Sequence, residues 1–350
     1  MNILGIETSC DETSAAVVRD GREVLSSIVH SQIAAHRPYG GVVPEIASRQ
    51  HVEHLSDVLA EAVRSAGLEW SQLDALAVTY GPGLASSLLV GLAAAKGLAL
   101  RLDRSLIGIH HMESHLYSAF LGLQAPAWES VMPCLALIVS GGHTLLLHVE
   151  APGRYRLIGQ TVDDAAGEAF DKGASLLGLG YPGGPAIDRA AREGGNPGAV
   201  IFPRGFPRKL HARFADDVDP SACFSFSGIK TALLYHLRKY PPGRDGNPGV
   251  ADLAASYQEA IVDTLVTRTL TALGRNETLV VAGGVSLNRR LRELLAAAAA
   301  ERGFRLLLAE PAYCTDNAAM VAGLAAHKLA TPPTLSESLA LDACPSIEFG

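Results

Sequence analysis

The sequence of 350 residues lacks the features that define several protein classes. Its five cysteines are odd in number and scattered, and no CxxC pair occurs. That pattern fits a reducing cytosol and argues against a disulfide framework or a zinc ribbon. The chain has no basic excess, because its formal net charge is -7. Any nucleic-acid site must therefore be a local basic patch.

Charge of either sign is also sparse. Charged residues make up 19% of the chain and hydrophobic residues 48%. This composition excludes a disordered chain and predicts a large hydrophobic core. At 350 residues the chain is long enough for two domains.

No long hydrophobic run is uninterrupted. The longest charge-free stretch, residues 75–95, contains the turn signal "YGPG" at 80–83. The break predicts a buried strand, a turn and a buried helix, and not a membrane span. The start of the chain is acidic, with Glu7, Asp11 and Glu12, and has no basic segment. We therefore expect no signal peptide, a cytoplasmic location and no contact with a membrane.

Two segments, residues 2–29 and 133–160, repeat one plan. Each has three apolar runs separated by short polar or glycine-containing turns, which predicts a strand, a turn, a strand, a turn and a strand. Helical and strand patterns follow each segment. The duplication predicts two similar lobes, and a cleft between two lobes is a preferred place for a ligand.

The stretch "HHMESH" at 110–115 is the first candidate site. On a helix His111 and His115 are one turn apart and share a face, so they can hold one divalent ion with a third ligand. A zinc metalloprotease needs glutamate directly after the first histidine, but Met112 stands there and Glu113 falls on another face. The alternative is a pair of surface or capping histidines.

Two acidic positions could complete such a site. Asp316 and Asn317 stand just before a predicted helix, where either is a plausible N-cap, and Asp316 is also a candidate third metal ligand. Asp11 lies at the tip of the turn 8–13, which suits a general base, a water-orienting group or a metal-linked role. An ordinary hairpin is the alternative for this turn.

Three glycine-containing turns are candidate ligand sites. Gly141 and Gly142 allow backbone N–H groups to approach an anion. The pair 283–284 ends a predicted strand, and Asn288 beyond it could bond a ribose or a base. The pair 183–184 precedes a helix that contains Asp188. Asp171 and Lys172 are predicted to form a charged pair within an apolar helix, with surface placement as the alternative.

Ten motifs occur in one order across residues 5–320, and together they closely resemble the TsaD family, also called Gcp or YgjD. They are "GIETSCDETSAAVV", "YGGVVPEIASRQHVEHL", "GPGLASSLLVGLAAAKGLA", "HHMESH", "LIVSGGHT", "DDAAGEAFDK", "YPGGPAID", "FSFSGIKTA", "AGGVSLNRRLR" and "CTDNAAM". The stretch "YGGVVPE" resembles the bacterial and organellar branch of the family.

The resemblance implies an α/β, actin-like two-lobed fold of the sugar kinase, heat-shock protein and actin superfamily. We expect a first lobe at 1–130, completed by a helix at about 316–332. A second lobe at 131–315 would carry an insertion at about 165–275, and a loosely held tail would cover 333–350. The implied activity is transfer of a threonylcarbamoyl group from threonylcarbamoyl-adenylate to N6 of the adenosine 3′ of the anticodon, in transfer RNAs that read codons beginning with A.

The resemblance also implies roles for single residues. His111, His115 and Asp316 look like ligands of one divalent metal, with Fe²⁺ expected and Zn²⁺ as the alternative, and Asp11 looks like a catalytic acidic residue. The positions that resemble substrate contacts are Ile138, Val139, Ser140, Gly141, Gly142, His143, Asp171, Gly184, Asp188 and Asn288.

The implied macromolecular partners are transfer RNA, a TsaB-like paralogue and a TsaE-like ATPase. Candidate RNA contacts are the basic residues Arg204, Arg208, Lys209, Arg213 and Lys230. The alternatives to this function are a metallopeptidase, historically a glycoprotein endopeptidase, a small-molecule kinase or ATPase of the same fold, and a scaffold without catalysis.

Overall fold

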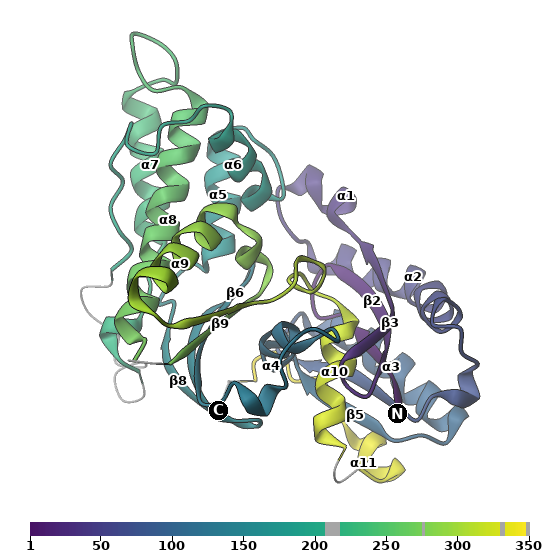
Figure 1. Ribbon diagram of the computed structural model, residues 1–350. Coiled ribbons are helices and arrows are strands. Elements are labelled where there is room, and N and C mark those ends of the chain that lie inside the picture. The colour runs from purple at the N-terminus through teal and green to yellow at the C-terminus, as the bar shows by residue number, and fades with distance from the viewer. Residues whose placement is uncertain (207–217, 275–276, 330–332, 348–350) are drawn as a thin grey trace. The chain divides into compact units, whose positions relative to one another are not determined.

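The computed structural model describes residues 1–206, 218–274, 277–329 and 333–347 (Figure 1). Contacts between Cα atoms divide the chain into two compact units. Unit 1 comprises Met1–Ser130 and Ala309–Phe349, and unit 2 comprises Val131–Leu308.

Unit 1 is built on a mixed five-stranded sheet in the order β3-β2-β1-β4-β5. Its strands are β1 (Asn2–Glu7), β2 (Glu12–Arg19), β3 (Glu23–Ser31), β4 (Ala75–Gly81) and β5 (Leu106–His110). β1, β2 and β3 are antiparallel neighbours, whereas β1, β4 and β5 are parallel. The carboxyl ends of β1, β4 and β5 therefore meet at one edge of the sheet.

The sheet of unit 2 has the same connectivity, in the order β10-β9-β6-β7-β8. Its strands are β6 (Cys134–Val139), β7 (Thr144–Ala151), β8 (Arg154–Gln160), β9 (Thr278–Ala282) and β10 (Arg305–Leu308). β6, β7 and β8 are antiparallel neighbours, and β6, β9 and β10 are parallel. The first strand of each unit thus lies at the centre of its sheet, which confirms the duplication predicted from residues 2–29 and 133–160.

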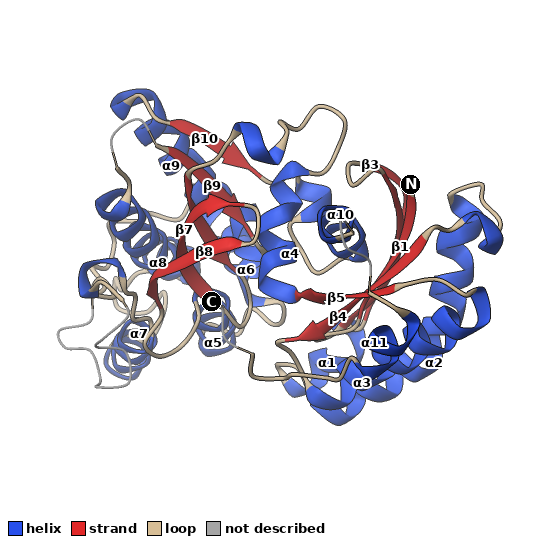
Figure 2. Ribbon diagram, turned by 90° about the horizontal axis from the view of Figure 1, so that it is seen from below, coloured by secondary structure: helices blue, strands red, loops and turns tan. Residues whose placement is uncertain are grey.

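Helices cover both faces of the sheet in unit 1. They are α1 (Ile33–His36), α2 (Pro44–Ser65), α3 (Ala85–Leu102), α4 (His111–Tyr117), α10 (Ala318–Lys328) and α11 (Leu335–Ala340). Figure 2 shows α2 and α3 on one face and α4 and α10 on the other. The alternating strand residues Leu4, Ile6 and Val17 pack with Leu59 of α2 and Leu92 of α3 in one hydrophobic cluster.

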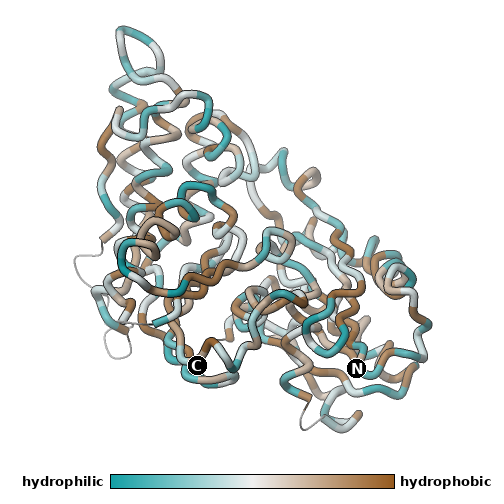
Figure 3. Tube along the Cα trace, in the orientation of Figure 1, coloured by the Kyte–Doolittle hydropathy of each residue, from teal (hydrophilic) through white to brown (hydrophobic). Residues whose placement is uncertain are grey.

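In its described residues, unit 2 carries four α-helices between β8 and β9 and one more before β10. They are α5 (Ala166–Leu176), α6 (Gly183–Arg192), α7 (Ser227–Lys239), α8 (Val250–Ala272) and α9 (Arg289–Arg302). The core strands of both units are hydrophobic stretches of the chain, as Figure 3 shows. Leu137 of β6 packs in one cluster with Phe170 of α5 and with Ile261 and Leu265 of α8.

Short 3-10 turns connect these elements. They are η1 (Arg37–Tyr39), η2 (Trp70–Gln72), η3 (Ser118–Phe120), η4 (Trp128–Ser130), η6 (Pro220–Ala222), η7 (Gly284–Leu287) and η8 (Pro311–Tyr313).

One helix in the described part of the chain, α3, is long and apolar enough to cross a membrane by length and composition alone. It follows β4 after the "YGPG" turn, so the predicted strand, turn and helix are confirmed. Leu88, Leu92 and Ala95 on one side of α3 are buried in unit 1, and Leu100 is exposed.

The tail is not loosely held in its described part, so that prediction is wrong. Leu335, Leu341 and Ala343 pack against the core of unit 1. The Cys344 amide donates to the Tyr80 carbonyl oxygen at 2.7 Å, and the Leu106 amide donates to Ser338 Oγ at 3.0 Å. The weak periodicity of this segment misled the sequence analysis, because part of the contact is made by backbone hydrogen bonds that leave no pattern in the sequence.

The closest approach of β1 to α10 depends on a missing side chain at Gly5. A Cβ added there would lie 2.3 Å from the Ala318 carbonyl oxygen and 2.8 Å from the Ala322 amide nitrogen. Both are backbone atoms of α10 and cannot move without shifting the helix. We expect Gly5→Ala to lower the free energy of unfolding of unit 1 by about 2 kcal/mol or more. The measurement is the midpoint temperature of thermal unfolding, which should fall.

Gly97→Ala is the matched control, because Gly97 lies on the exposed side of α3 with open space around a new Cβ. Alanine is the better helix former, so this variant should unfold at the parent temperature or slightly above it. Equal losses in the two variants would contradict the proposed packing of β1 on α10.

Candidate functional site

The candidate site in unit 1 lies where its parallel strands end. β5 ends at His110 and α4 begins at the next residue, so His111 is delivered to the carboxyl edge of the sheet. This edge is a recurrent ligand site in open α/β sheets. His111 and His115 share a face of α4, as their spacing predicts, and every residue of this helix is buried.

Asp316 reaches the same place from the far end of the sequence. Asn317, and not Asp316, caps α10, because its side chain accepts a hydrogen bond of 3.1 Å from the Met320 amide. The Ala318 amide donates to Ser14 Oγ at 2.9 Å, which fixes the start of α10 against β2. The carboxylate of Asp316 lies close to both histidines.

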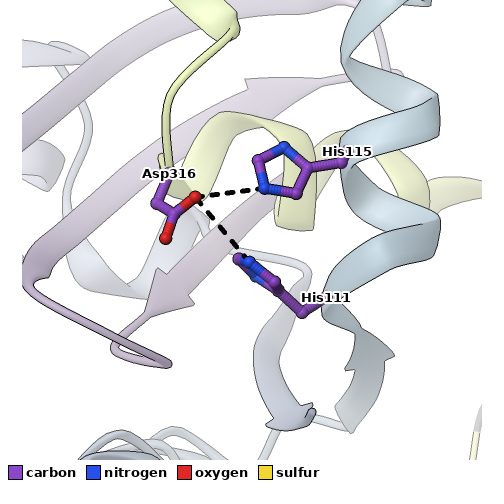
Figure 4. Close-up of side chains that lie close together, drawn as sticks. All are labelled: His111, His115 and Asp316. Carbon is purple, nitrogen blue, oxygen red and sulfur yellow. Dashed lines mark ion pairs between the residues drawn. The ribbon is translucent and has the colours of Figure 1, made fainter. Parts of the chain in front are cut away.

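Figure 4 shows the three side chains directed toward one another. Asp316 Oδ1 lies 3.1 Å from His115 Nε2 and 3.7 Å from His111 Nε2, and one potential ligand atom of each residue lies within 4.8 Å of the others. Among the described residues, this is the one group of three such side chains close enough to hold a metal ion. The geometry that the sequence predicted for His111, His115 and Asp316 is thus present.

The donor set fits a divalent cation. Both ring nitrogens of His115 are buried and make no hydrogen bond to any described residue, although Asp316 Oδ1 is near. Buried polar atoms without partners are costly. A cation held between these groups would satisfy His115 Nε2 and the carboxylate together, and two imidazoles with one carboxylate are common ligands of iron and zinc.

Glu7 orients the first histidine, and the sequence analysis missed it. Its Oε2 lies 3.1 Å from His111 Nδ1 and accepts a 2.6 Å hydrogen bond from Thr79 Oγ1, while Oε1 accepts another of 2.6 Å from the Ser9 amide. Glu7 is fully buried. The sequence signal that could have indicated this role is a carboxylate at the end of an apolar strand. This strand, β1, ends at the same edge of the sheet as the parallel strand β4.

The electrostatics of the site favour a cation. Burial lowers the pKa of His111, but Glu7 and Asp316 outweigh this and raise the pKa to about 9. Burial raises the pKa of Glu7, yet the neighbouring His111 outweighs it and the net pKa is lowered. Burial, followed by the charges of Asp11 and Asp316, raises the pKa of Glu12 well above its ordinary value. Several acidic side chains thus share one poorly hydrated region.

Asp11 belongs to this acidic region and does not project into solvent. Its turn joins β1 to β2, but Asp11 is 9% exposed. Asp11 and Asp316 both contribute to the raised pKa of the Cys10 thiol, after burial itself.

In unit 2 the turn at 140–143 presents two exposed glycines. Ser140 N donates to the His143 carbonyl oxygen at 2.9 Å, and His143 N donates to Ser140 Oγ at 3.2 Å. Gly141 and Gly142 are exposed, with open space where a side chain would stand. Ile138 and Val139 are fully buried strand residues, so they can offer a ligand only their backbone.

The predicted Asp171–Lys172 pair is wrong. Lys172 Nζ bonds Glu168 at 2.7 Å and Asp164 at 2.8 Å. Asp171 Oδ1 accepts a 2.6 Å hydrogen bond from the Gly183 amide and so fixes the start of α6. Adjacent residues on a helix point in different directions, whereas residues four apart are neighbours.

The remaining candidate residues in unit 2 differ in the space around them and in the hydrogen bonds that they make within the unit. Gly184 has open space around it, and Asp188 Oδ1 is buried without a hydrogen-bond partner among the described residues, while its Oδ2 pairs with Arg192 at 2.9 Å. Asn288 is engaged at both ends, since it caps α9 through Leu291 N and donates to Gln258 Oε1. The predicted contact of Asn288 with a ribose or a base stays a prediction.

The basic cluster is only partly described. Arg204 pairs with Asp263 at 2.5 Å and also donates to the Phe202 carbonyl oxygen, so its charge is largely compensated within unit 2. Lys230 is half-buried on α7. Arg208, Lys209 and Arg213 lie outside the described residues.

The duplicated sheets and the two-histidine, one-carboxylate group define an α/β protein of two equivalent units with a candidate metal centre. Comparison with families of known proteins is more specific. The TsaD family, tRNA N6-adenosine threonylcarbamoyltransferase, matches residues 23–323. The chain belongs to this family, which confirms the resemblance seen in its motifs.

Two relatives carry the same family description, "tRNA N6-adenosine threonylcarbamoyltransferase". The protein of Magnetococcus marinus is 52% identical over 340 residues, covering 94% of this chain and 92% of the relative. That of Anaeromyxobacter dehalogenans is 53% identical over 330 residues, covering 93% and 94%.

Solved structures support the fold alone. HypF of T. kodakarensis matches with a TM-score of 0.55 at 14% identity, over 97% of this chain and 47% of that protein. The activator of 2-hydroxyisocaproyl-CoA dehydratase from Clostridium difficile matches with a TM-score of 0.52 at 13% identity, over 97% and 96%. The predicted actin-like fold is confirmed.

The metallopeptidase alternative is not favoured. Glu113, the acidic residue of "HHMESH", bonds Lys328 Nζ at 2.5 Å and is nearly buried there. It is tied to the end of α10 and is not available as a general base beside the histidines.

Glu7→Gln should weaken binding of Fe²⁺ or Zn²⁺ about 10- to 100-fold, because the carboxylate no longer fixes the ring of His111. Competition with a coloured chelator measures this affinity. Glu45→Gln is the control, since Glu45 is exposed on α2. Equal affinities in the parent chain and Glu7→Gln would show that Glu7 does not orient a ligand.

Metal binding should release a proton from His111. Its raised pKa means that the metal-free imidazole is charged below a pH of about 9, and a metal can bind only the neutral ring. Calorimetry at about pH 7.5 in two buffers of different ionisation enthalpy should reveal roughly one proton released per ion, falling toward none above pH 9. Binding heats independent of the buffer would contradict a charged His111.

Proposed function

We propose that this chain performs the reaction for which its family is named, the transfer of a threonylcarbamoyl group to N6 of an adenosine in transfer RNA. The donor would be threonylcarbamoyl-adenylate, and the acceptor the adenosine 3′ of the anticodon in transfer RNAs that read codons beginning with A. The observation that carries the proposal is sequence identity with these relatives at about half of the aligned positions, over nearly the whole chain. The assembled histidine–aspartate group supports it.

The proposed reaction requires the protein to position the two reactants and to stabilise charge, and it requires no covalent enzyme intermediate. The N6 amine is a weak nucleophile, whereas the donor is already activated as a mixed carbamic–phosphoric anhydride. In the step, N6 bonds to the carbamoyl carbon, the bond from that carbon to the phosphate oxygen breaks, and AMP leaves. The amine loses one proton. Holding both reactants in place supplies much of the acceleration.

His111, His115 and Asp316 would hold one divalent ion, for which Fe²⁺ is the expected metal and Zn²⁺ the alternative. When bound, such an ion supplies Lewis-acid polarisation of a carbonyl or phosphoryl oxygen. Glu7 keeps the His111 ring turned so that Nε2 faces Asp316. Asp11 would accept the proton from the amine, or orient the amine as it attacks.

Residues of unit 2 would bind the adenylate. The amides of the exposed Gly141 and Gly142 suit an anionic group, since consecutive exposed N–H groups form an anion-binding concavity. The unpartnered Oδ1 of Asp188 suits a hydroxyl donor such as a ribose. Asp171 and Asn288 would act by shaping the turns before α6 and α9, because their side chains already bond the backbone there.

The macromolecular partners follow from the same family membership. Transfer RNA would be contacted by the basic cluster Arg204, Arg208, Lys209, Arg213 and Lys230 in the cytoplasm. A TsaB-like paralogue would dock on α2 and α3, where Val52 is 67% exposed and Leu89 is 52% exposed. A TsaE-like ATPase would complete the assembly.

The function is tested with purified chain, the adenylate donor, transfer RNA and the paralogue and ATPase partners. Liquid chromatography with mass analysis of digested RNA should show N6-threonylcarbamoyladenosine in place of adenosine. An unchanged nucleoside profile, with all partners and metal present, would remove the proposal.

Asp11→Asn should lower the transfer rate at least about a hundredfold, which is the usual contribution of a general base. Donor binding, RNA binding and metal content should stay near those of the parent chain. Asp57→Asn is the control, because Asp57 is exposed on α2. Transfer by Asp11→Asn at the parent rate would show that the base role is wrong.

A further inference from the structure

Four polar side chains are buried together in unit 1, apart from the metal ligands. Thr13 lies on β2, Gln32 follows β3, His36 ends α1 and His51 lies on α2, and each is at most 1% exposed. Burial of so many polar groups is costly unless every one is hydrogen-bonded. His51 belongs to the motif at 39–55, for which the proposed chemistry gives no role.

The four residues, which we call the Thr13–His51 relay, form one directed chain of hydrogen bonds. The Val43 amide donates to His36 Nδ1 at 3.2 Å, so His36 carries its proton on Nε2 and donates to Gln32 Oε1 at 3.2 Å. The Gln32 amide group then donates to the Ala47 carbonyl oxygen at 3.3 Å. It also lies 3.4 Å from Thr13 Oγ1 and 3.3 Å from His51 Nδ1.

The second half of the relay reaches the acidic turn. Thr13 Oγ1 lies 2.7 Å from His51 Nδ1, and His51 Nε2 lies 3.0 Å from the Cys10 carbonyl oxygen. A carbonyl oxygen can only accept, so His51 carries its proton on Nε2 and leaves Nδ1 to accept from Thr13. The backbone amide of Gln32 also donates to the Asp11 carbonyl oxygen at 3.0 Å.

The relay therefore ends on two consecutive carbonyl groups, those of Cys10 and Asp11. Fixing both peptide groups sets the direction in which the Asp11 side chain leaves the backbone. Every donor in the chain faces an acceptor, so a single tautomer of each histidine satisfies the arrangement. Burial lowers the pKa of His51, which keeps Nδ1 unprotonated and able to accept at neutral pH.

We propose that the Thr13–His51 relay is a positioning device that holds the Cys10–Asp11 turn and so aims the Asp11 carboxylate at the reacting amine. This inference rests on the proposed function of Asp11. None of the four residues touches substrate or metal in it, and each acts through the backbone of the turn.

The decisive variants remove one hydrogen bond and then restore it. Thr13→Val keeps the shape of the side chain but loses the hydroxyl that donates to His51, and Thr13→Ser returns it. His51→Leu loses the donor to the Cys10 carbonyl oxygen, and His51→Gln can supply a new one. The control is His54→Leu, because His54 lies on the same helix but stacks on His30 outside the relay.

We expect Thr13→Val and His51→Leu to lower kcat about 10- to 100-fold, as misplaced catalytic groups do, with KM for donor and RNA changed less than about twofold. Thr13→Ser, His51→Gln and His54→Leu should stay near the parent kcat, and metal content should be unchanged throughout. A folded Thr13→Val chain with parent kcat, or a loss confined to KM, would overturn the proposal.

A second measurement is independent of activity. Nitrogen NMR of chain labelled at histidine should show His51 neutral with its proton on Nε2. Amide exchange at Asp11 and Glu12, whose N–H groups belong to the two held peptide groups, should accelerate in Thr13→Val. A proton on Nδ1, or unchanged exchange, would overturn the relay itself. If the parent chain makes no modified nucleoside while both signatures are present, the proposed function fails and the relay stands as a structural device.

Discussion

The contact between the Glu7 carboxylate and the His111 imidazole is the constraint on which the site depends. It joins the last residue of β1 to the first residue of α4, and it can form only because β1, β4 and β5 run parallel and end at one edge. Thr79 at the end of β4 donates to the same carboxylate oxygen. Sheet topology thus places the first histidine, and the helical turn from His111 then places His115.

Asp316 completes the group because α10 is held against the sheet from several sides. Gly5 allows the helix backbone to approach β1, Ser14 holds its first amide, and Lys328 at its other end is paired with Glu113 of α4. The elements that carry the three ligands are therefore braced at both ends. This packing holds the half-buried Asp316 carboxylate beside two buried imidazoles, and a cation between them would offset the cost of burying these groups.

The duplicated sheets carry opposite chemistry at equivalent turns. Between β1 and β2 the turn is acidic, buried and held by the Thr13–His51 relay. Between β6 and β7 the turn is rich in glycine, and Gly141 and Gly142 are exposed. One turn suits a proton acceptor or a cation and the other suits an anion, which is the division that the proposed transfer requires.

Much of the fold was predictable, because apolar periodicity marks strands and helices locally, and the four-residue spacing of His111 and His115 fixes a shared helix face. The sequence did not predict contacts between distant elements, or contacts that depend on the direction in which a side chain points. The role of Glu7 requires three strands to end together. The relay joins residues of β2, α1 and α2 with Gln32, which lies between β3 and α1. The Asp171–Lys172 pairing failed because adjacency in sequence is not adjacency on a helix. The cap that Asn288 forms on α9 was not predicted, because a helix cap and a ligand contact use the same residue type.

X-ray absorption spectroscopy of the metal-loaded chain tests the central claim most directly. The account predicts one divalent ion per chain with two imidazole ligands and a carboxylate oxygen, and one imidazole fewer in His115→Ala. An ion that binds without imidazole ligands, or a spectrum unchanged by His115→Ala, would contradict it.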